Sequence, residues 1–504
     1  MKSVIRNLHQ QLISGNVTCR ELVKEKISLL TANKYHSANL ILEESALALA
    51  EQVDEKIKTG QSIGLLEGIP FGIQDVLLLQ GSFASGSSGF LKNYVASYTA
   101  TVVNKLMAAG AIPVVKENGD SMGHGCTGGN TFFGAVLHAH ETGRVAGGAN
   151  GGSAVNVSKG YTVFSVGANT GGAIPAGYNK VYGLKPTYGR VSRYGLMANS
   201  SSTDCVGPVA ASLEDIPILM NVMSGKDAHD LTTYASTPLP ENIFETKMAK
   251  EKITVGYYKS FLENKYVDAA IKTPFQKMID TLSNQNIRVI PLDSFDIEAV
   301  AASYFVLTMA ETSSNLARLD GSVYGARSNN KNVQEGYMIT RAENLSDETK
   351  RRIIGGIQVT SHGFDDDVYR KALIFKNQLL DAYKRDFENV DIILSPVSLT
   401  LPPIQPVSAD IPPAIGQDMQ PVSLTLPPIQ PVSADLPPAI SQNPDNTLAT
   451  YLSEAFTAGF NLGGLPTLTA PLFTPTGIQI TADKNREDFI LTFANYLEEA
   501  EPWT

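Results

Sequence analysis

Residues 147–173 read GGANGGSAVNVSKGYTVFSVGANTGGA, and this stretch decides the fold. Glycine pairs stand at 147–148, 151–152 and 171–172. Because glycine has no Cβ, such pairs let backbone N–H groups come close together, as they do in an oxyanion hole. Neither GxxxxGK[ST] nor GxGxxG after a strand is present, which argues against a nucleotide-phosphate loop.

Two further segments accompany the glycine-rich stretch: GIPFGIQDVL at 68–77 and YGLKPTYGRVSRYG at 182–195. Together the three segments closely resemble the amidase signature family, and the resemblance covers roughly residues 1–395 and 447–482. Within that family, the A-type chains of glutamine-dependent amidotransferases are the most similar. The resemblance implies an α/β fold with a large mixed, mostly parallel central sheet that helices cover on both faces.

The resemblance also implies a catalytic triad, and this chain lacks all three of its side chains. Family members use a lysine, a bridging serine in a cis peptide and a nucleophilic serine; the matching positions are Gln74, Ala149 and Ala173. Their separations of 75 and 24 residues match the family's spacing. A carboxamide is not a base near neutral pH, and alanine offers no nucleophile. We therefore expect no hydrolysis by the family mechanism.

The loop that would form the oxyanion site comprises Asn169, Thr170, Gly171 and Gly172, and the family usually has aspartate at the first of these positions. Other nucleophiles are available nearby in sequence. Thr170 and Ser153 lack a candidate base, whereas Cys126 follows His124 by two residues and suggests a thiol–imidazole pair. A cysteine in a glycine-rich turn is more often a small packed residue.

Two positions outside the triad match ligand-binding residues of the A-type transamidase chains. The resemblance assigns an arginine in KRRII (350–354), with Arg352 favoured over Arg351, to the carboxylate of glutamine. It assigns Glu454 to the amino group. Part of a pocket for a small amide or carboxylate is thus expected to remain, and the family relationship implies a B-type amidotransferase subunit or another protein as partner.

Composition limits the other functions. The 504-residue chain has a formal charge of −10 and a pI near 5.3, without a basic block, so we expect no strong direct binding to nucleic acid. No apolar run is long enough to span a membrane, and no signal peptide is evident. Cys19, Cys126 and Cys205 form no disulfide pattern, which suits a cytoplasmic protein.

No cofactor or metal is expected. The pair His138 and His140 is the nearest approach to a metal motif, and it lacks a third ligand.

We interpret residues 1–504 as a single amidase-like domain that begins with a helical segment over residues 1–60. A capping box of Thr18 and Glu21 and a helix over 44–58 are predicted within that segment. Further along, apolar runs alternate with helical patterns, which indicates an α/β layered fold. The predicted strands are 111–115, 253–258, 287–292 and 391–396, with a helix over 267–285 between the second and third.

The composition changes at residues 396–440, where 12 of the 27 prolines fall. PVSLTLPPIQPVSADIPPAI at 396–415 recurs at 421–440 with one difference, Ile411 against Leu436. Proline at this density favours extended polyproline-like backbone, and the near-identity indicates a tandem duplication in a tolerant surface loop.

Three functional hypotheses follow. The first is a catalytically inactive amidase-fold protein that binds a partner or a small ligand. The second is an active amidase or amidotransferase that uses non-standard residues. The third is a scaffold that acts through the proline-rich loop, whose paired prolines could dock on an aromatic groove.

Overall fold

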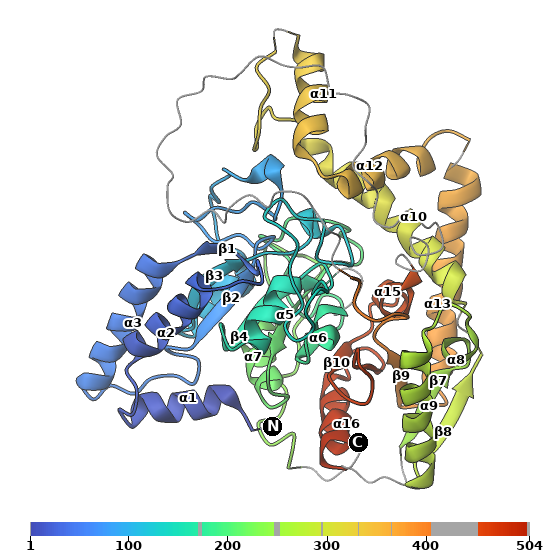
Figure 1. Ribbon diagram of the computed structural model, residues 1–504. Coiled ribbons are helices and arrows are strands. Elements are labelled where there is room, and N and C mark those ends of the chain that lie inside the picture. The colour runs from blue at the N-terminus through green and yellow to red at the C-terminus, as the bar shows by residue number, and fades with distance from the viewer. Residues whose placement is uncertain are drawn as a thin grey trace.

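The computed structural model describes residues 2–169, 174–245, 253–293, 296–330, 332–363, 365–404 and 452–500. Its strands form one 11-stranded sheet with the order β1-β3-β2-β4-β6-β5-β10-β11-β9-β7-β8 (Figure 1). The strands are β1 Ala38–Ile41, β2 Pro70–Gln74, β3 Ile112–Glu117, β4 Phe164–Asn169, β5 Tyr182–Lys185, β6 Cys205–Ala210, β7 Thr254–Tyr258, β8 Arg288–Leu292, β9 Ile392–Pro396, β10 Thr467–Ala470 and β11 Ile478–Thr481.

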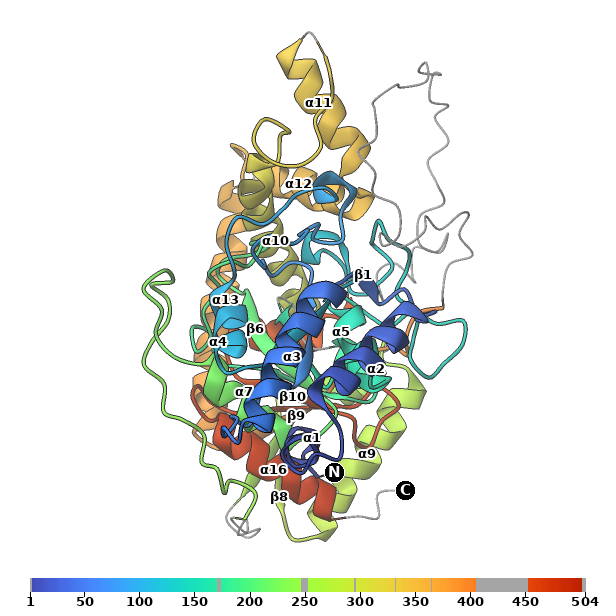
Figure 2. The ribbon, with the colours of Figure 1, turned by 90° about the vertical axis from the view of Figure 1, so that its left-hand side faces the viewer.

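The helices that accompany this sheet are α1 Val4–Ile13, α2 Cys19–Thr31, α3 Glu43–Lys58, α4 Thr101–Ala108, α5 Gly151–Ser158, α6 Ile174–Tyr178, α7 Asp215–Met223, α8 Ser260–Glu263, α9 Ala269–Asn284, α10 Ile297–Asn315, α11 Val333–Asn344, α12 Asp347–Val359, α13 Arg370–Phe387, α15 Ala455–Leu462 and α16 Glu487–Glu499. Helices α2 and α3 lie side by side near β1, and α11 projects away from the sheet (Figures 1 and 2). Within the described ranges, no helix has the length and apolar character needed to cross a bilayer.

The sheet is mixed, as predicted, but it is not mostly parallel. Among its ten neighbouring pairs, only β2–β3, β2–β4, β7–β8 and β7–β9 are parallel. The other six pairs, which include all those from β4 through β6, β5, β10 and β11 to β9, are antiparallel. The sequence patterns revealed mainly the strands that alternate with long helices, and such crossovers produce parallel pairs. The central strands were not recognised from those patterns.

Helices cover both faces of the sheet, which confirms the predicted α/β layering. On β6, Val206 and Ala210 pack into the largest hydrophobic core, together with side chains of α2, α4, α7 and α16. Val209, which the strand period places on the opposite face, packs instead with Ala154 of α5 and Ala176 of α6. The α5 face is the one that carries the glycine-rich stretch.

Several predicted elements are confirmed. The helix over 44–58 is α3, and α2 begins with the capping box of Thr18 and Glu21. Strands β3, β7, β8 and β9 lie within one or two residues of the predicted runs.

The proline-rich region begins inside the folded core rather than in a surface loop. Val397 and Leu399 are fully buried, and the Tyr178 hydroxyl donates to Ser398 Oγ at 2.8 Å. The backbone N–H of Val145 donates to the Pro403 carbonyl at 3.0 Å. The first copy therefore supplies core side chains before the described chain breaks off at residue 404, and residues 405–440 lie outside the described residues.

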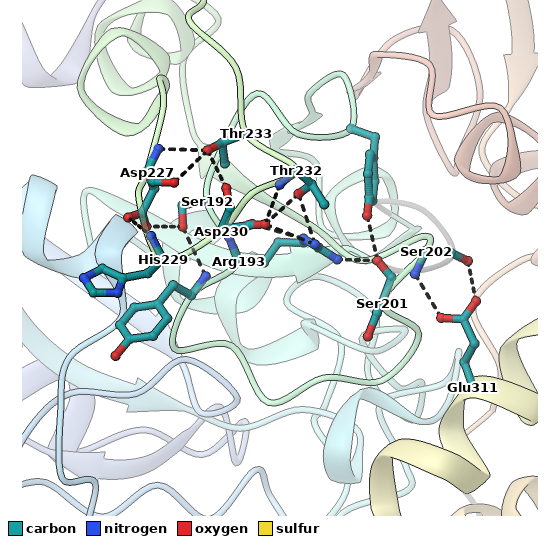
Figure 3. A network of polar contacts seen from close by, with 12 residues as sticks. Ser192, Arg193, Ser201, Ser202, Asp227, His229, Asp230, Thr232, Thr233 and Glu311 are labelled. Carbon is teal, nitrogen blue, oxygen red and sulfur yellow. Dashed lines mark hydrogen bonds and ion pairs between the residues drawn. The ribbon is translucent and has the colours of Figure 1, made fainter.

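A polar network holds the loop that follows β5, within the run YGLKPTYGRVSRYG (Figure 3). Asp230 accepts a hydrogen bond from the backbone N–H of Arg193 at 2.9 Å and pairs with its guanidinium at 3.3 Å. Asp227 accepts from the Ser192 hydroxyl at 2.6 Å, and Glu311 of α10 accepts from the backbone of Ser202 at 2.9 Å. These contacts fix both ends of the segment that carries Asn199.

Asn199 joins a buried junction between α10, α12 and the loop after β3. The centre of this junction is His124, which is fully buried. Its Nε2 lies 3.0 Å from Asn199 Oδ1, and its Nδ1 lies 3.2 Å from Thr349 Oγ1 of α12. Burial lowers the pKa of His124 to about 3, and the positive charge of Arg352 acts in the same direction. The imidazole is therefore neutral at physiological pH.

The lowered pKa of His124 makes its contribution to stability depend on pH. As the pH falls, the unfolded chain binds the proton near the ordinary value of 6.5, whereas the native state binds it near 3. The contribution is thus present above pH 6.5 and is lost as the pH falls toward 3. Between pH 7 and pH 5, we expect the wild type to lose about 2 kcal/mol more of its unfolding free energy than His124→Gln.

Urea unfolding at the two pH values measures this difference. The control is His362→Gln, because His362 is exposed and outside the junction. This control should follow the wild type. Equal losses in the wild type and in His124→Gln would contradict the buried neutral imidazole.

Candidate functional site

The structure brings two of the three triad positions together. Gln74 is the last residue of β2, and Ala149 lies in the turn before α5; Gln74 Nε2 is 3.5 Å from the carbonyl oxygen of Ala149. The Gly148–Ala149 peptide bond is cis. Asn169 ends β4. The remaining positions of the predicted loop, Thr170, Gly171, Gly172 and Ala173, lie outside the described residues.

Gln74 is buried, with 2% of its surface exposed. Its Oε1 accepts a hydrogen bond from the backbone N–H of Ala168 at 2.6 Å. Ala149 and Ala168 are both partly exposed, so the carboxamide lies behind a surface formed by two small side chains. Neither a base nor a hydroxyl is present at this surface among the described triad positions.

A buried lysine nearby does not replace the missing base. In the register of β2 with β3, Lys116 is opposite Ile73 and Glu117 is opposite Gln74. Lys116 therefore points to the face of the sheet away from Gln74. Its ammonium pairs with Asp75 at 3.2 Å and donates to the Leu77 carbonyl. Burial lowers the pKa of Lys116, and Asp75 opposes that shift.

Ser153 has a carboxyl partner that the sequence did not indicate. Its hydroxyl donates to Glu117 at 2.6 Å, and Glu117 also accepts from Ser165 at 2.7 Å and from Asn156 at 3.0 Å. Burial raises the pKa of Glu117 to about 7, against these three donors. A serine beside such a carboxyl has the form of a nucleophile and its base. Ser153 is fully buried, however, so the pair holds α5 against β3 and β4 rather than facing a substrate.

Arg352 and Glu454 come from distant parts of the sequence and meet in a second buried cluster. Arg352, on α12, is 3% exposed; its Nε donates to Glu348 at 2.9 Å, and its guanidinium lies 5.4 Å from the Phe305 ring centroid. Glu454 precedes α15 and is also buried. Burial raises the pKa of Glu454 to about 7, and Arg352 opposes this shift. Arg352 keeps its charge because Glu454 and Glu348 outweigh its burial.

Cys126 borders this second cluster and does not pair with His124. Both nitrogens of the His124 ring are engaged by Thr349 and Asn199. Burial raises the pKa of the Cys126 thiol well above its ordinary value, and the negative charge of Glu454 adds to the effect. Because the thiolate is the reactive form, this environment disfavours Cys126 as a nucleophile.

The histidine pair lies away from any cluster of metal ligands. His138 Nδ1 accepts from the backbone N–H groups of His140 and Glu141, at 3.0 and 2.9 Å. His140 Nε2 lies 2.8 Å from the Ser158 hydroxyl. Across the described part of the chain, no three histidine, cysteine or acidic side chains are grouped so as to hold a metal ion.

Sequence reasoning missed Lys116 and Glu117, which lie behind the site. The available signal was the pair of opposite charges that ends the apolar run of β3, in VVKENGD at 114–120. Charged residues at the end of a fully buried strand must find partners inside the protein, because an unpaired buried charge is costly.

Comparison with known proteins supports the identity that the motifs suggested. The Amidase family model matches residues 21–419. The A chain of glutamyl-tRNA(Gln) amidotransferase from Chlorobaculum tepidum is 31% identical over 507 residues, which cover 98% of this chain and 97% of that protein. The protein of the same name from Nitratiruptor sp. is 35% identical over 440 residues, or 86% of this chain and 90% of that protein.

Solved structures show the same fold. The structure of the corresponding glutamyl-tRNA(Gln) amidotransferase chain from Thermotoga maritima has a TM-score of 0.72 and 25% identity, and it covers 96% of this chain and 92% of that one. A structure described as an amidase has a TM-score of 0.77 at 23% identity, with full coverage of both chains. By sequence, motifs and fold, this chain belongs to the amidase signature family.

Proposed function

We propose that this protein is a non-hydrolytic member of the amidase family, whose emptied site binds a small amide or carboxylate within a complex that includes a partner subunit. The observation that carries the proposal is the carboxamide of Gln74 at the position of the family's lysine, beside a turn where Ala149 replaces the bridging serine. Loss of the nucleophile alone slows a serine hydrolase about a million-fold. That factor corresponds to roughly 8 kcal/mol of activation free energy.

The partner follows from the relatives rather than from a surface of this chain. The curated relatives are named as one subunit of an amidotransferase, which implies association with other subunits. We infer that a B-type subunit is the natural partner of this chain as well.

The pocket of the second cluster supplies the ligand chemistry. Arg352 offers a cation that stays charged, and Glu454 offers a carboxyl group whose pKa is about 7. A ligand with one carboxylate and one amino group would match both side chains, as the family resemblance implies for glutamine. The Glu348 carboxylate already occupies the Nε side of Arg352 and leaves its terminal nitrogens for a ligand.

The first test is an assay of amide hydrolysis. The purified full chain, alone and with the proteins that co-purify with it, should release ammonia from glutamine no faster than a buffer control. Thr170→Val and Cys126→Ala should leave that background unchanged. Turnover that resists further purification and disappears with an amide-directed covalent inhibitor would contradict the proposal, and its loss in either variant would identify the alternative nucleophile.

The second test concerns the ligand. L-glutamine binding, measured by calorimetry on the full chain at pH 8, should weaken at least about tenfold in Glu454→Gln, because removal of one charge from a desolvated pair costs more than about 1.4 kcal/mol. Glu311→Gln serves as a matched control, since Glu311 binds the Ser202 segment on the other side of Asn199. Equal affinities in the wild type and in Glu454→Gln would remove Glu454 from the site.

A second candidate function is scaffolding through the duplicated proline-rich segment, and the ends of that segment favour it. The chain leaves the described core after Ile404, which forms a β-bridge with Arg144, five residues before Ala149. It returns at Leu452, two residues before Glu454. A protein bound to this segment would thus be attached next to both halves of the site.

Replacement of residues 405–440 by a Gly/Ser linker tests the scaffold. The replacement begins at 405 because residues 396–404 contribute to the core. The variant should keep the unfolding midpoint of the wild type but lose its co-purifying partner if the segment is the docking element. Deletion of the second copy alone, 421–440, shows whether one copy suffices. An unchanged set of partners in the larger replacement would end the scaffold hypothesis.

A further inference from the structure

The carboxamide of Gln74 makes a contact that the lysine of an active amidase could not make. Its Oε1 accepts the backbone N–H of Ala168 at 2.6 Å, the short distance of a well-formed hydrogen bond. The β2–β4 register ends at Ile73 with Val166, so the Gln74 side chain continues the pairing of the two strands beyond their last backbone pair. A lysine ammonium has donors only and would face another donor at this position.

The surroundings leave the carboxamide little freedom. A Cβ added to Gly167 would lie 2.8 Å from Gln74 Oε1 and 3.4 Å from Asn150 Nδ2, so the amide packs directly on the backbone of β4. On its other side, Nε2 makes the longer contact of 3.5 Å with the Ala149 carbonyl, which also accepts from the Asp120 backbone at 2.9 Å. The carboxamide thus lies between the end of β4 and the turn that contains Ala149.

Charge adds to this constraint. The residue after Gln74 is Asp75, whose carboxylate already pairs with the buried Lys116. Asp75 also accepts from the hydroxyl of Ser85 and from the amide of Asn39. A second buried ammonium at position 74 would find this nearest carboxylate fully engaged.

We propose that Gln74 is a structural replacement as well as a catalytic loss: its carboxamide links the end of β4 to the Ala149 turn, and this link prevents the return of the lysine. Restoration of Lys, Ser and Ser at positions 74, 149 and 173 would therefore fail to rebuild a stable active site. The inference rests on the proposed function only in that Gln74 has no catalytic role.

The test compares stability and amide hydrogen exchange in full-length variants. Gln74→Met, of similar length but without the acceptor, should lower the thermal unfolding midpoint by on the order of 2 °C or more. Exchange of the Ala168 amide should become at least tenfold faster in this variant, while the Val166 amide exchanges as in the wild type. Gln80→Met is the matched control, because Gln80 is exposed and its side chain is outside the site.

The triple variant Gln74→Lys/Ala149→Ser/Ala173→Ser and the double variant Ala149→Ser/Ala173→Ser complete the experiment. The double variant should keep the wild-type midpoint, and the triple variant should fall below it and show fast exchange at Ala168. Wild-type stability and exchange in the triple variant, or in Gln74→Met, would overturn the inference. Ammonia release from glutamine by a stable triple variant would overturn it too, yet would support the proposed function, because three side chains would then account for the lost activity.

Discussion

The site depends on backbone segments that pack against each other with no side chain between them. A Cβ on Gly119 would lie 2.1 Å from the Ala149 carbonyl oxygen, and one on Gly152 would lie 2.3 Å from the Asn118 carbonyl oxygen. A Cβ on Gly128 would approach the Gly147 carbonyl to 2.7 Å. These approaches are closer than real side chains tolerate, so the glycines hold the turn in place whether or not catalysis occurs. Their presence is therefore compatible with the loss of all three catalytic side chains.

Buried polar groups form the second layer of the same architecture. Glu117 ties α5 to β4 through Ser153 and Ser165, and the pair of Lys116 with Asp75 secures the opposite face. An unpaired buried charge costs several kcal/mol, so each of these groups requires its partner in place. The surroundings of the former catalytic centre are thus constrained independently of its chemistry, which explains how the fold persists around Gln74 and Ala149.

The pocket cluster differs from these structural pairs in the balance of its charges. Arg352 is accompanied by two carboxyl groups, Glu348 and Glu454, and burial raises the pKa of Glu454 toward neutrality. A carboxyl group that is neither fully paired nor fully ionised gains from a ligand that supplies a positive or hydrogen-bonding group. The degenerate triad and this cluster therefore separate two properties of an amidase site, the splitting of a bond and the recognition of a ligand.

Local patterns were sufficient for the family, the α/β class, helix α3, the α2 capping box and the strands next to long helices, because periodicity and capping are properties of neighbouring residues. The spacing of Gln74 and Ala149 likewise predicted that they would meet. The antiparallel centre of the sheet, the Ser153–Glu117 pair and the bond from Ala168 to Gln74 arose only in the folded molecule. Each joins segments far apart in the chain, and their geometry depends on strand order and register, which no local pattern records.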